Sequence, residues 1–296
     1  MAGILYVVAT PIGNMEDMTY RAKRTLTEVD LVAAEDTRTA MKLFTMLGIR
    51  NKLISNHKFN EKKQVDYLLS ELLQGKDVAI VSDAGTPCIS DPGAVIISHA
   101  TNHGIQVIGV CGASAVITAL SISGFHFTSF AFYGFFPREN KEVKETLQKI
   151  VEGHIVVSVF FISPKQIQKT LDIIRDTFPG ADLCLCNDLT KRYEKIYRGT
   201  VAEVIEAVRN NPSAEKGEYT LVIQTRNKSE PSTNPDWSLE AMLIDHLVKN
   251  GGTIKDAIDA MQKLHKGKLS KKEFYAASLH LKTLLNAETS LGGKPC

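Results

Sequence analysis

Short apolar runs alternate with amphipathic stretches along the first hundred residues of the chain. Runs at 4–9, 31–34, 53–55, 78–81 and 105–110 have the length of buried strands. The stretches between them carry apolar residues at helical spacing. This alternation predicts an α/β fold whose first sheet is mostly parallel and doubly wound.

Two helices in this half of the chain have recognisable ends. One has apolar residues at the i, i+3, i+4, i+7, i+8 spacing, at Val65, Leu68, Leu69, Leu72 and Leu73. Gly75 follows, and we expect it to end that helix in the left-handed conformation. Asp91 is predicted to cap the next helix, with Pro92 in its first position and Gly104 after its end.

The second half reads as another α/β unit followed by a separate tail. Apolar or aromatic runs at 127–136, 155–162, 183–186 and 219–224 predict strands. The segment after Arg226 has two prolines and no large apolar residue, which is typical of a linker. The predicted division is an α/β domain at 1–118, a second α/β domain at 119–226, a linker at 227–236 and a small helical domain at 237–296.

The tail carries three short helical stripes and an excess of positive charge. Thr253 with Asp256, and Ser270 with Glu273, have the spacing of capping boxes at helix starts. Residues 237–296 contain nine Lys and Arg against six Asp and Glu. Basic side chains gather at one helix junction, at His265, Lys266, Lys268, Lys271 and Lys272. Charge alone favours RNA contact and a solubilising surface about equally.

Composition narrows the classes of protein that fit. With 44% apolar residues, 23% charged residues and a net charge of +2, the chain is neither disordered nor fibrous. No run approaches the roughly 18 apolar residues of a membrane helix, and no basic leader with an apolar core is visible, so we expect a cytoplasmic protein. The cysteines number five, and we expect reduced thiols. Zinc at Cys184 and Cys186 is the alternative, disfavoured because no second Cys or His pair has finger spacing.

Three predicted strands of the first unit end in loops of small or turn-forming residues. These are Thr-Pro-Ile-Gly-Asn at 10–14, Ser-Asp-Ala-Gly-Thr-Pro at 82–87 and Cys-Gly-Ala-Ser-Ala at 111–115. In an open parallel sheet, ligands bind beyond the carboxyl ends of the strands, where such loops let backbone approach them. One loop alone is ordinary turn chemistry, but three at one edge favour a nucleotide-like ligand. None matches a dinucleotide-fold or P-loop motif, which argues against NAD and ATP.

Two polar clusters follow strands of the same unit. Ala-Glu-Asp-Thr-Arg at 34–38 places two carboxylates and a guanidinium at a strand end. This is either part of a site or a helix start whose acids favour the helix dipole. His57 opens a second cluster that ends at Glu61, and a lone histidine in such a place is more often structural.

These motifs resemble those of a known family. In order along the chain, the segments at 5–14, 34–38, 82–93 and 189–191 resemble the bacterial ribosomal RNA small subunit methyltransferase I family, which belongs to the tetrapyrrole methylase superfamily. The resemblance covers about residues 4–225, and the tail is similar to the small helical C-terminal domain of that family.

The resemblance implies a class III methyltransferase fold, with S-adenosylmethionine in the cleft between two α/β domains, and a homodimer. The implied reaction is 2′-O-methylation of a cytidine ribose in the decoding region of small-subunit (16S) ribosomal RNA. The implied partner is that RNA or the assembled small ribosomal subunit, and no metal is expected. Cofactor contacts carried over by motif are Pro11, Ile12, Asp83, Gly85, Thr86, Ser114, Ala115, Phe161, Leu189, Thr190 and Thr220.

The chain departs from the family pattern at several motifs. Lys58 stands where the family usually has a glutamate, and Cys-Gly-Ala-Ser-Ala at 111–115 replaces Pro-Gly-Pro-Ser-Ala. In the second unit, Ile162 stands in place of a glutamate and Asn187 in place of an arginine. These second-unit changes bear on the substrate side more than on the cofactor side.

A ribose hydroxyl is a weak nucleophile, so a side chain that accepts its proton is expected. The candidates, in falling order, are Asp36, Glu35, Asp188 and Lys191, with Arg38 as a clamp on a phosphate or carboxylate. Basic residues that could face RNA are Arg138, Lys141, Lys144, Lys191, Arg192, Lys195 and Arg198, although such sets are more often solvated surface.

Two other functions stay open at this point. One is a methyltransferase of the same fold that acts on a tetrapyrrole or a protein side chain, against which the motifs at 35–38 and 82–87 argue. The other is an inactive RNA-binding or ribosome-assembly factor, which the altered second-unit motifs support.

Overall fold

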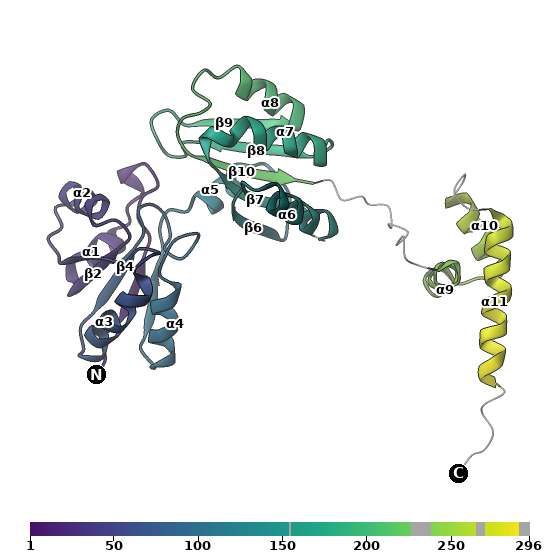
Figure 1. Ribbon diagram of the computed structural model, residues 1–296, viewed down its shortest axis with the longest axis horizontal. Coiled ribbons are helices and arrows are strands. Elements are labelled where there is room, and N and C mark those ends of the chain that lie inside the picture. Colours follow the sequence, from purple (N-terminus) through teal and green to yellow (C-terminus); the bar gives the residue numbers. More distant parts are fainter. Residues whose placement is uncertain (154, 226–237, 265–269, 290–296) are drawn as a thin grey trace, which may run out of the picture. The chain divides into compact units, whose positions relative to one another are not determined.

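The computed structural model describes residues 1–153, 155–225, 238–264 and 270–289 (Figure 1). The chain divides into two compact units, Met1–Arg226 and Asn227–Cys296, and each is described here by itself. Within the described ranges, no helix is both long enough and apolar enough to cross a membrane.

The first sheet is parallel and has five strands in the order β3-β2-β4-β1-β5. Its strands are β1 (Leu5–Val8), β2 (Leu31–Ala34), β3 (Leu53–Ser55), β4 (Val78–Val81) and β5 (Val107–Val110). The predicted parallel, doubly wound sheet is therefore confirmed. The run at 105–110 begins as a strand only at Val107.

Helices cover both faces of this sheet. The short 3-10 helix η1 (Met15–Asp17) precedes them, and the helices are α1 (Tyr20–Glu28), α2 (Thr37–Leu47), α3 (Glu61–Leu73) and α4 (Ala94–Asn102). Helices α1 and α2 bury Leu26 and Phe44 against one face. Helices α3 and α4 bury Leu68 and Ile96 against the other. Because neighbouring strand residues point to opposite faces, both faces need apolar residues, which explains the continuous apolar runs.

The start of α4 differs from the prediction. Its N-cap is Gly93, at a φ of +131°, and not Asp91. The Oε1 atom of Glu61 accepts hydrogen bonds from the backbone N–H groups of Gly93 (2.7 Å) and Val95 (3.1 Å). A carboxylate from α3 thus satisfies the helix start, which leaves Asp91 free for another role.

The second sheet is mixed, in the order β6-β7-β10-β8-β9. Its strands are β6 (Phe130–Phe135), β7 (Val157–Ile162), β8 (Asp182–Asn187), β9 (Lys195–Thr200) and β10 (Tyr219–Gln224). Only β6 and β7 run parallel, and the other pairings are antiparallel. Strand β9 lacks an apolar run because it is an edge strand with partly exposed side chains, so the sequence pattern missed it.

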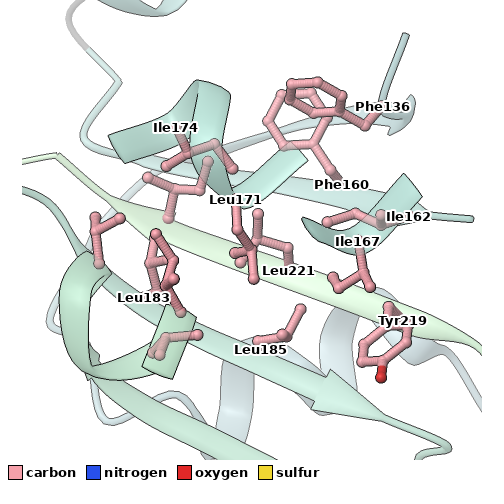
Figure 2. Close-up of a cluster of buried hydrophobic side chains, with 14 of the residues drawn as sticks. Phe136, Phe160, Ile162, Ile167, Leu171, Ile174, Leu183, Leu185, Tyr219 and Leu221 are labelled. Atoms are coloured by element: carbon pink, nitrogen blue, oxygen red, sulfur yellow. The ribbon is translucent and has the colours of Figure 1, made fainter. Parts of the chain in front are cut away.

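A large apolar core lies on one face of this sheet (Figure 2). The helices over that face are α6 (Asn140–Glu152), α7 (Ile167–Thr177) and α8 (Val201–Arg209). The short 3-10 helix η2 (Pro164–Gln166) directly precedes α7. In Figure 2, Leu171 and Ile174 of α7 lie over side chains of the strands. The burial of these side chains anchors the second sheet.

The opposite face of the second sheet packs against α5 (Ala115–Ile122). Val116, Ala119 and Leu120 of α5 join a cluster with Val159 and Val222. The division expected after residue 118 would cut this helix, so we propose the loop at 111–114 as the boundary between the two α/β domains.

The C-terminal unit consists of α9 (Leu239–Asn250), α10 (Ile254–Leu264) and α11 (Lys271–Thr289). Its core is formed by Leu243, Ala257, Ile258, Phe274, Ala277 and Leu281. Both predicted capping boxes are present, because each acid accepts a hydrogen bond from the N–H of the residue three before it. The carboxylate oxygens lie 2.9 Å from the N of Thr253 and 2.7 Å from the N of Ser270.

The basic cluster expected in the tail lies partly outside the described residues. His265, Lys266 and Lys268 belong to that part. Lys271 pairs with Asp259 at 2.6 Å, and Lys272 is exposed. RNA contact by the tail therefore stays a prediction.

Ser158→Ala is expected to leave the free energy of unfolding unchanged or to raise it by about 1 kcal/mol. Ser158 lies in β7, is 1% exposed, and its hydroxyl has no hydrogen-bond partner among the described residues. Equilibrium urea unfolding measures the effect. The matched control is Ser123→Ala, because the buried Ser123 hydroxyl donates to Leu120 O (2.8 Å) and accepts from Phe125 N (3.1 Å). That control should lose about 1 kcal/mol, and equal losses in both variants would contradict the prediction.

Candidate functional site

The three loops at the carboxyl edge of the first sheet are tied together by hydrogen bonds. Thr10 and Gly85 exchange two backbone bonds, with N···O distances of 2.9 and 3.0 Å. The Thr86 hydroxyl donates to the carbonyl oxygen of Ala113 at 3.2 Å. Ser114 then caps α5, accepting from the N–H of Ile117. The loops that the sequence placed at one edge therefore form one connected structure.

A cavity of about 550 Å³ lies beside these loops, within the size range of small-molecule sites. It is lined from both sheets, by the loop at 82–91, the start of α5, the ends of β6 and β7 and the start of β10. Nine of the candidate cofactor-binding and catalytic residues line it: Ile12, Glu35, Asp83, Gly85, Thr86, Ser114, Ala115, Phe161 and Thr220. The structure thus gathers residues that are up to about two hundred positions apart in the chain.

Three other expected cofactor contacts do not line this cavity. Pro11 precedes Ile12 in the first loop, and Leu189 is buried in the cluster around α5. Thr190 lines a second cavity of about 470 Å³, which shares Ile12 with the first. Thr190 has a φ of +66°, and its hydroxyl oxygen is buried without a hydrogen-bond partner in the part of the chain that the structure describes. A buried polar atom of that kind is available to a ligand or a water molecule.

Asp36 and Arg38 form a local pair at the start of α2. The Asp36 carboxylate caps α2 by accepting from the Arg38 N–H, and it forms an ion pair with the Arg38 guanidinium at 2.6 Å. The hydrogen bond from the Arg38 side chain lowers the pKa of Asp36 to about 2. Neither residue lines the cavity. The helix-start interpretation therefore explains this pair, and a carboxylate with so low a pKa is a poor proton acceptor.

Glu35 and Asp83 do line the cavity, and each steadies the other's loop. The Asp83 N–H donates to Glu35 Oε2 (3.4 Å), and the Asp36 N–H donates to Asp83 Oδ1 (3.1 Å). Burial raises the pKa of Glu35, and the Asp83 charge adds to that shift. Burial also raises the pKa of Asp83, and the Asp36 charge acts in the same direction.

Asp91 is a third carboxylate in this wall of the cavity, a position that the sequence pattern did not predict. Its place before a proline predicts a helix cap, but the cap of α4 is Gly93. Burial, and then the nearby Glu35 charge, raise the pKa of Asp91 to about 6. The sequence feature that could have predicted this position is the family motif at 82–93, which includes Asp91.

Lys191 joins a charged cluster formed by loops of the second sheet. Its Nζ atom lies 2.9 Å from Asp188 Oδ1 and 3.0 Å from Glu218 Oε2. Burial favours the neutral form of Lys191, but these two carboxylates outweigh it and its pKa is raised. A protonated lysine cannot act as the base, so Lys191 does not fit that role. A Cβ atom added to Gly13 would clash with Lys191 Cγ, so the first loop packs directly on this side chain.

Several other polar residues singled out from the sequence have local partners. His57 Nδ1 accepts from the N–H groups of Phe59 and Asn60, both at 3.2 Å, which is a structural role. Lys195 donates to the side chain of Asn211 (3.1 Å). Arg198 donates to the carbonyl oxygen of Ile122 at the end of α5, at 2.7 and 3.0 Å.

The remaining basic residues of the expected rim differ in position. Arg192 lies over the ring of Tyr193, 5.5 Å from its centroid, and Lys141 and Lys144 are exposed. Arg138 lines the cavity, together with Phe135 and Glu218, which sequence reasoning did not assign to the cofactor or to catalysis. Phe135 and Glu218 stand at the ends of strands, and no local pattern distinguished them from ordinary strand-end residues.

Comparison with known proteins shows which families this chain is similar to. The model of the Tetrapyrrole (Corrin/Porphyrin) Methylases family matches residues 4–205. A protein of Bacillus subtilis (strain 168) called ribosomal RNA small subunit methyltransferase I is 39% identical over 259 residues, which is 86% of this chain and 88% of the relative. A protein of Haemophilus influenzae with the same name is 36% identical and covers 90% of this chain and 93% of its own length.

Solved structures agree on the fold at much lower identity. A uroporphyrin-III-C-methyltransferase from Thermus thermophilus is 18% identical, with a TM-score of 0.52 over 75% of this chain and 94% of that one. A diphthine synthase is 12% identical, with a TM-score of 0.57 over 75% of this chain and 90% of that one. At these identities the likeness concerns the fold alone.

Gly85→Ala is expected to lower the free energy of unfolding by about 1–2 kcal/mol and to weaken S-adenosylmethionine binding at least about tenfold. Gly85 has a φ of +80°, and its added Cβ would lie 3.3 Å from the Ile12 side chain in the cavity wall. Calorimetric titration and urea unfolding measure the two effects. Gly104→Ala is the matched control, because Gly104 has a φ of +69° with nothing within 4 Å of the added atom. The control should lose stability only, and a Gly85 variant that binds as the wild type does would disprove this placement of the site.

Asp91→Asn is expected to raise the melting temperature at pH 8 and to lose part of that gain at pH 5. The folded-state pKa of Asp91, about 6, lies above its ordinary value of 3.8, so the native state takes up a proton as the pH falls through 6. Wild-type stability linked to this group therefore rises on acidification, whereas the amide has no charge to bury at any pH. Thermal unfolding of both proteins from pH 5 to 8 measures it. A difference that does not change with pH would refute the assignment.

Proposed function

This chain belongs to the tetrapyrrole methylase family, and from that premise we propose that it methylates the ribose 2′-hydroxyl of a cytidine in small-subunit ribosomal RNA. It is an S-adenosylmethionine-dependent methyltransferase. The relatives named as ribosomal RNA small subunit methyltransferases are 36–39% identical over 86–90% of the chain, which supports ribosomal RNA as the substrate. The names of these relatives specify the RNA but not the methylated atom or nucleotide, so the 2′-oxygen and the cytidine are our proposal.

The main support for the proposal is the cavity beside the three hydrogen-bonded loops of the first sheet. Its charged lining consists of Glu35, Asp83, Asp91 and Glu218 against one arginine, Arg138, among the described residues. A wall with that excess of carboxylates favours a ligand that carries positive charge, as a sulfonium does. The residues present therefore fit the cofactor that the family uses.

We assign the cofactor to the loops and to the ends of the second sheet. A ligand can approach the backbone closely at Gly85 and at the start of α5. The Thr86 side chain is held in place by its hydrogen bond to the Ala113 carbonyl oxygen. Phe161 and Thr220 line the cavity from the second sheet, on the neighbouring strands β7 and β10. When bound, S-adenosylmethionine supplies an activated methyl group, so the chain's main task is to orient the nucleophile and exclude water.

We assign proton removal from the ribose hydroxyl to Glu35. Its Oε2 atom is held by the Asp83 N–H, whereas Oε1 has no hydrogen-bond partner among the described residues. The raised pKa of Glu35 makes its carboxylate a better proton acceptor than Asp36, which the Arg38 side chain holds at low pKa. Asp188 is engaged by Lys191 and by the Glu218 N–H, at 2.9 and 3.2 Å, and does not line the cavity.

The alternatives are weaker on these observations. A tetrapyrrole or protein substrate is suggested by the general description of the family and by structures that are 12–18% identical to this chain, whereas the relatives at 36–39% identity are named for ribosomal RNA. An inactive assembly factor would not need a cavity lined by carboxylates with raised pKa. We further propose that the enzyme is a homodimer, and that it works in the cytoplasm because ribosomal RNA is modified where ribosomes are assembled.

The test is a methyl-transfer assay with labelled S-adenosylmethionine on assembled small subunits, naked small-subunit RNA and a porphyrinogen. We expect label only in the RNA substrates, and nucleoside mass spectrometry should identify it as 2′-O-methylcytidine. Glu35→Gln should lower kcat by about 10²–10⁴-fold, the usual contribution of a general base, with little change in cofactor affinity. Label on a base, on the porphyrinogen, or nowhere would refute the proposal.

A further inference from the structure

Strand β6 contains a bulge at its carboxyl end. Phe132 lies opposite Val159 of β7, but the next pair joins Phe135 to Phe161, so β6 carries one extra residue. Gly134 lies within this bulge at a φ of +73°, a conformation that glycine adopts without strain. Bulges of this kind redirect side chains and are frequent next to active sites.

The bulge decides which face of the sheet Phe135 occupies. Side chains alternate along a regular strand, so residue 135 would share the face of Tyr133, whose ring stacks on Phe160 at 5.1 Å in the buried core. With the extra residue, Phe136 takes that buried place instead, 5% exposed and 5.2 Å from Phe160. Phe135 is turned to the other face, where its ring meets the Phe161 ring edge-on at 5.5 Å.

On that face, Phe135 lines the cavity and is 63% exposed. The side of the ring that faces away from Phe161 is therefore open to a ligand. Aromatic rings in such positions are the surfaces on which proteins stack unpaired nucleobases.

Arg138 follows three residues later and lines the same cavity. Its guanidinium forms no hydrogen bond or ion pair with any residue that the structure describes, unlike Arg38 and Arg198. It is also the cationic member of a lining that otherwise carries four carboxylates. An unpaired arginine beside an exposed aromatic ring suits a phosphate next to a stacked base.

The loop at 82–93, which follows β4 of the first sheet, lies close to the bulge. A Cβ atom added to Gly134 would lie 3.4 Å from Ser90 Oγ, and Ser90 itself has a φ of +72°. Ser90 and the neighbouring Ile89, which is partly exposed, also line the cavity. Phe135 and Arg138 thus line the same cavity as the carboxylates Glu35 and Asp91.

We propose that Phe135 and Arg138 form the subsite for the target nucleotide, in which Phe135 stacks on the base and Arg138 binds a flanking phosphate of the RNA. This inference rests on the proposed function and adds the part of the site that selects a single-stranded nucleotide. It requires the target base to leave its stack, because stacking on Phe135 needs an open face of the base.

The test uses the full-length protein and the variants Phe135→Ala, Phe135→Leu, Phe135→Trp and Arg138→Gln. Controls are Phe59→Ala, which removes a 92%-exposed ring that does not line the cavity, and Arg24→Gln on the exposed surface of α1. For each protein we would measure S-adenosylmethionine affinity by calorimetry, kcat and KM with small subunits, and the salt dependence of RNA binding. Light scattering would report the oligomeric state.

Phe135→Ala and Phe135→Leu should lose about 5- to 150-fold in kcat/KM for the RNA substrate, with cofactor affinity unchanged, and Phe135→Trp should retain activity. The leucine variant preserves packing on Phe161, so it separates lost stacking from lost folding. Arg138→Gln should flatten the salt dependence of RNA binding by about one unit of slope. Both controls should behave as the wild type does.

Each of the following outcomes would contradict a specific part of the proposal. If Arg138→Gln weakens cofactor binding and leaves the salt slope intact, Arg138 binds the cofactor carboxylate and the phosphate assignment is wrong. If Phe135→Ala changes the oligomeric state, or leaves kcat/KM unchanged, Phe135 belongs to a contact between copies or to none, and the stacking assignment is wrong. Wild-type protein that neither binds nor methylates the RNA refutes the proposed function, and this inference with it.

Discussion

Two backbone hydrogen bonds between Thr10 and Gly85 are the contact on which the rest of the site depends. They join the first two loops of the parallel sheet, and Thr86 extends the connection to the third loop through Ala113. They require Gly85 to stay at positive φ, close to Ile12. The first loop can then reach Lys191, on which Gly13 packs without room for a side chain. The paired loops therefore meet the second α/β domain at Lys191.

Ion pairing and burial divide the acidic residues into two groups with different pKa values. Carboxylates that find a cation, such as Asp36 with Arg38, keep a low pKa and become structural. Carboxylates at the cavity wall, such as Glu35 and Asp91, lose water without gaining a cation, so their pKa values rise. The same loss of water strengthens their attraction for a positively charged ligand. One physical cause therefore explains both the pKa shifts and the selectivity that we propose for the cavity.

Backbone strain gathers around the same region. Among the described residues, the non-glycine positions with positive φ are Cys88, Ser90, Asp188 and Thr190. Two lie in the loop after β4 and two in the loop after β8, and both loops contribute to the cavities or support them. Such conformations cost about 1–3 kcal/mol each and persist where the surrounding structure holds them, most often at binding sites. Ser90 lies beside the bulge in β6, because a Cβ atom added to Gly134 would be 3.4 Å from Ser90 Oγ.

Local pattern and motif predicted most of the first sheet and part of the cavity wall. The apolar runs at 31–34 and 78–81 became β2 and β4 with the predicted bounds, because a strand buried on both faces must be apolar at every position. The motifs also placed Glu35 and Asp83 in the site, since loops at the ends of parallel strands must share one edge. Tertiary structure alone decided three features: edge strand β9, the cap of α4 by Glu61, and the places of Asp91, Phe135 and Glu218 in the cavity wall. Each depends on a partner from a distant segment, and neither spacing nor composition records which distant segment fills a helix end, covers a strand or faces a cavity.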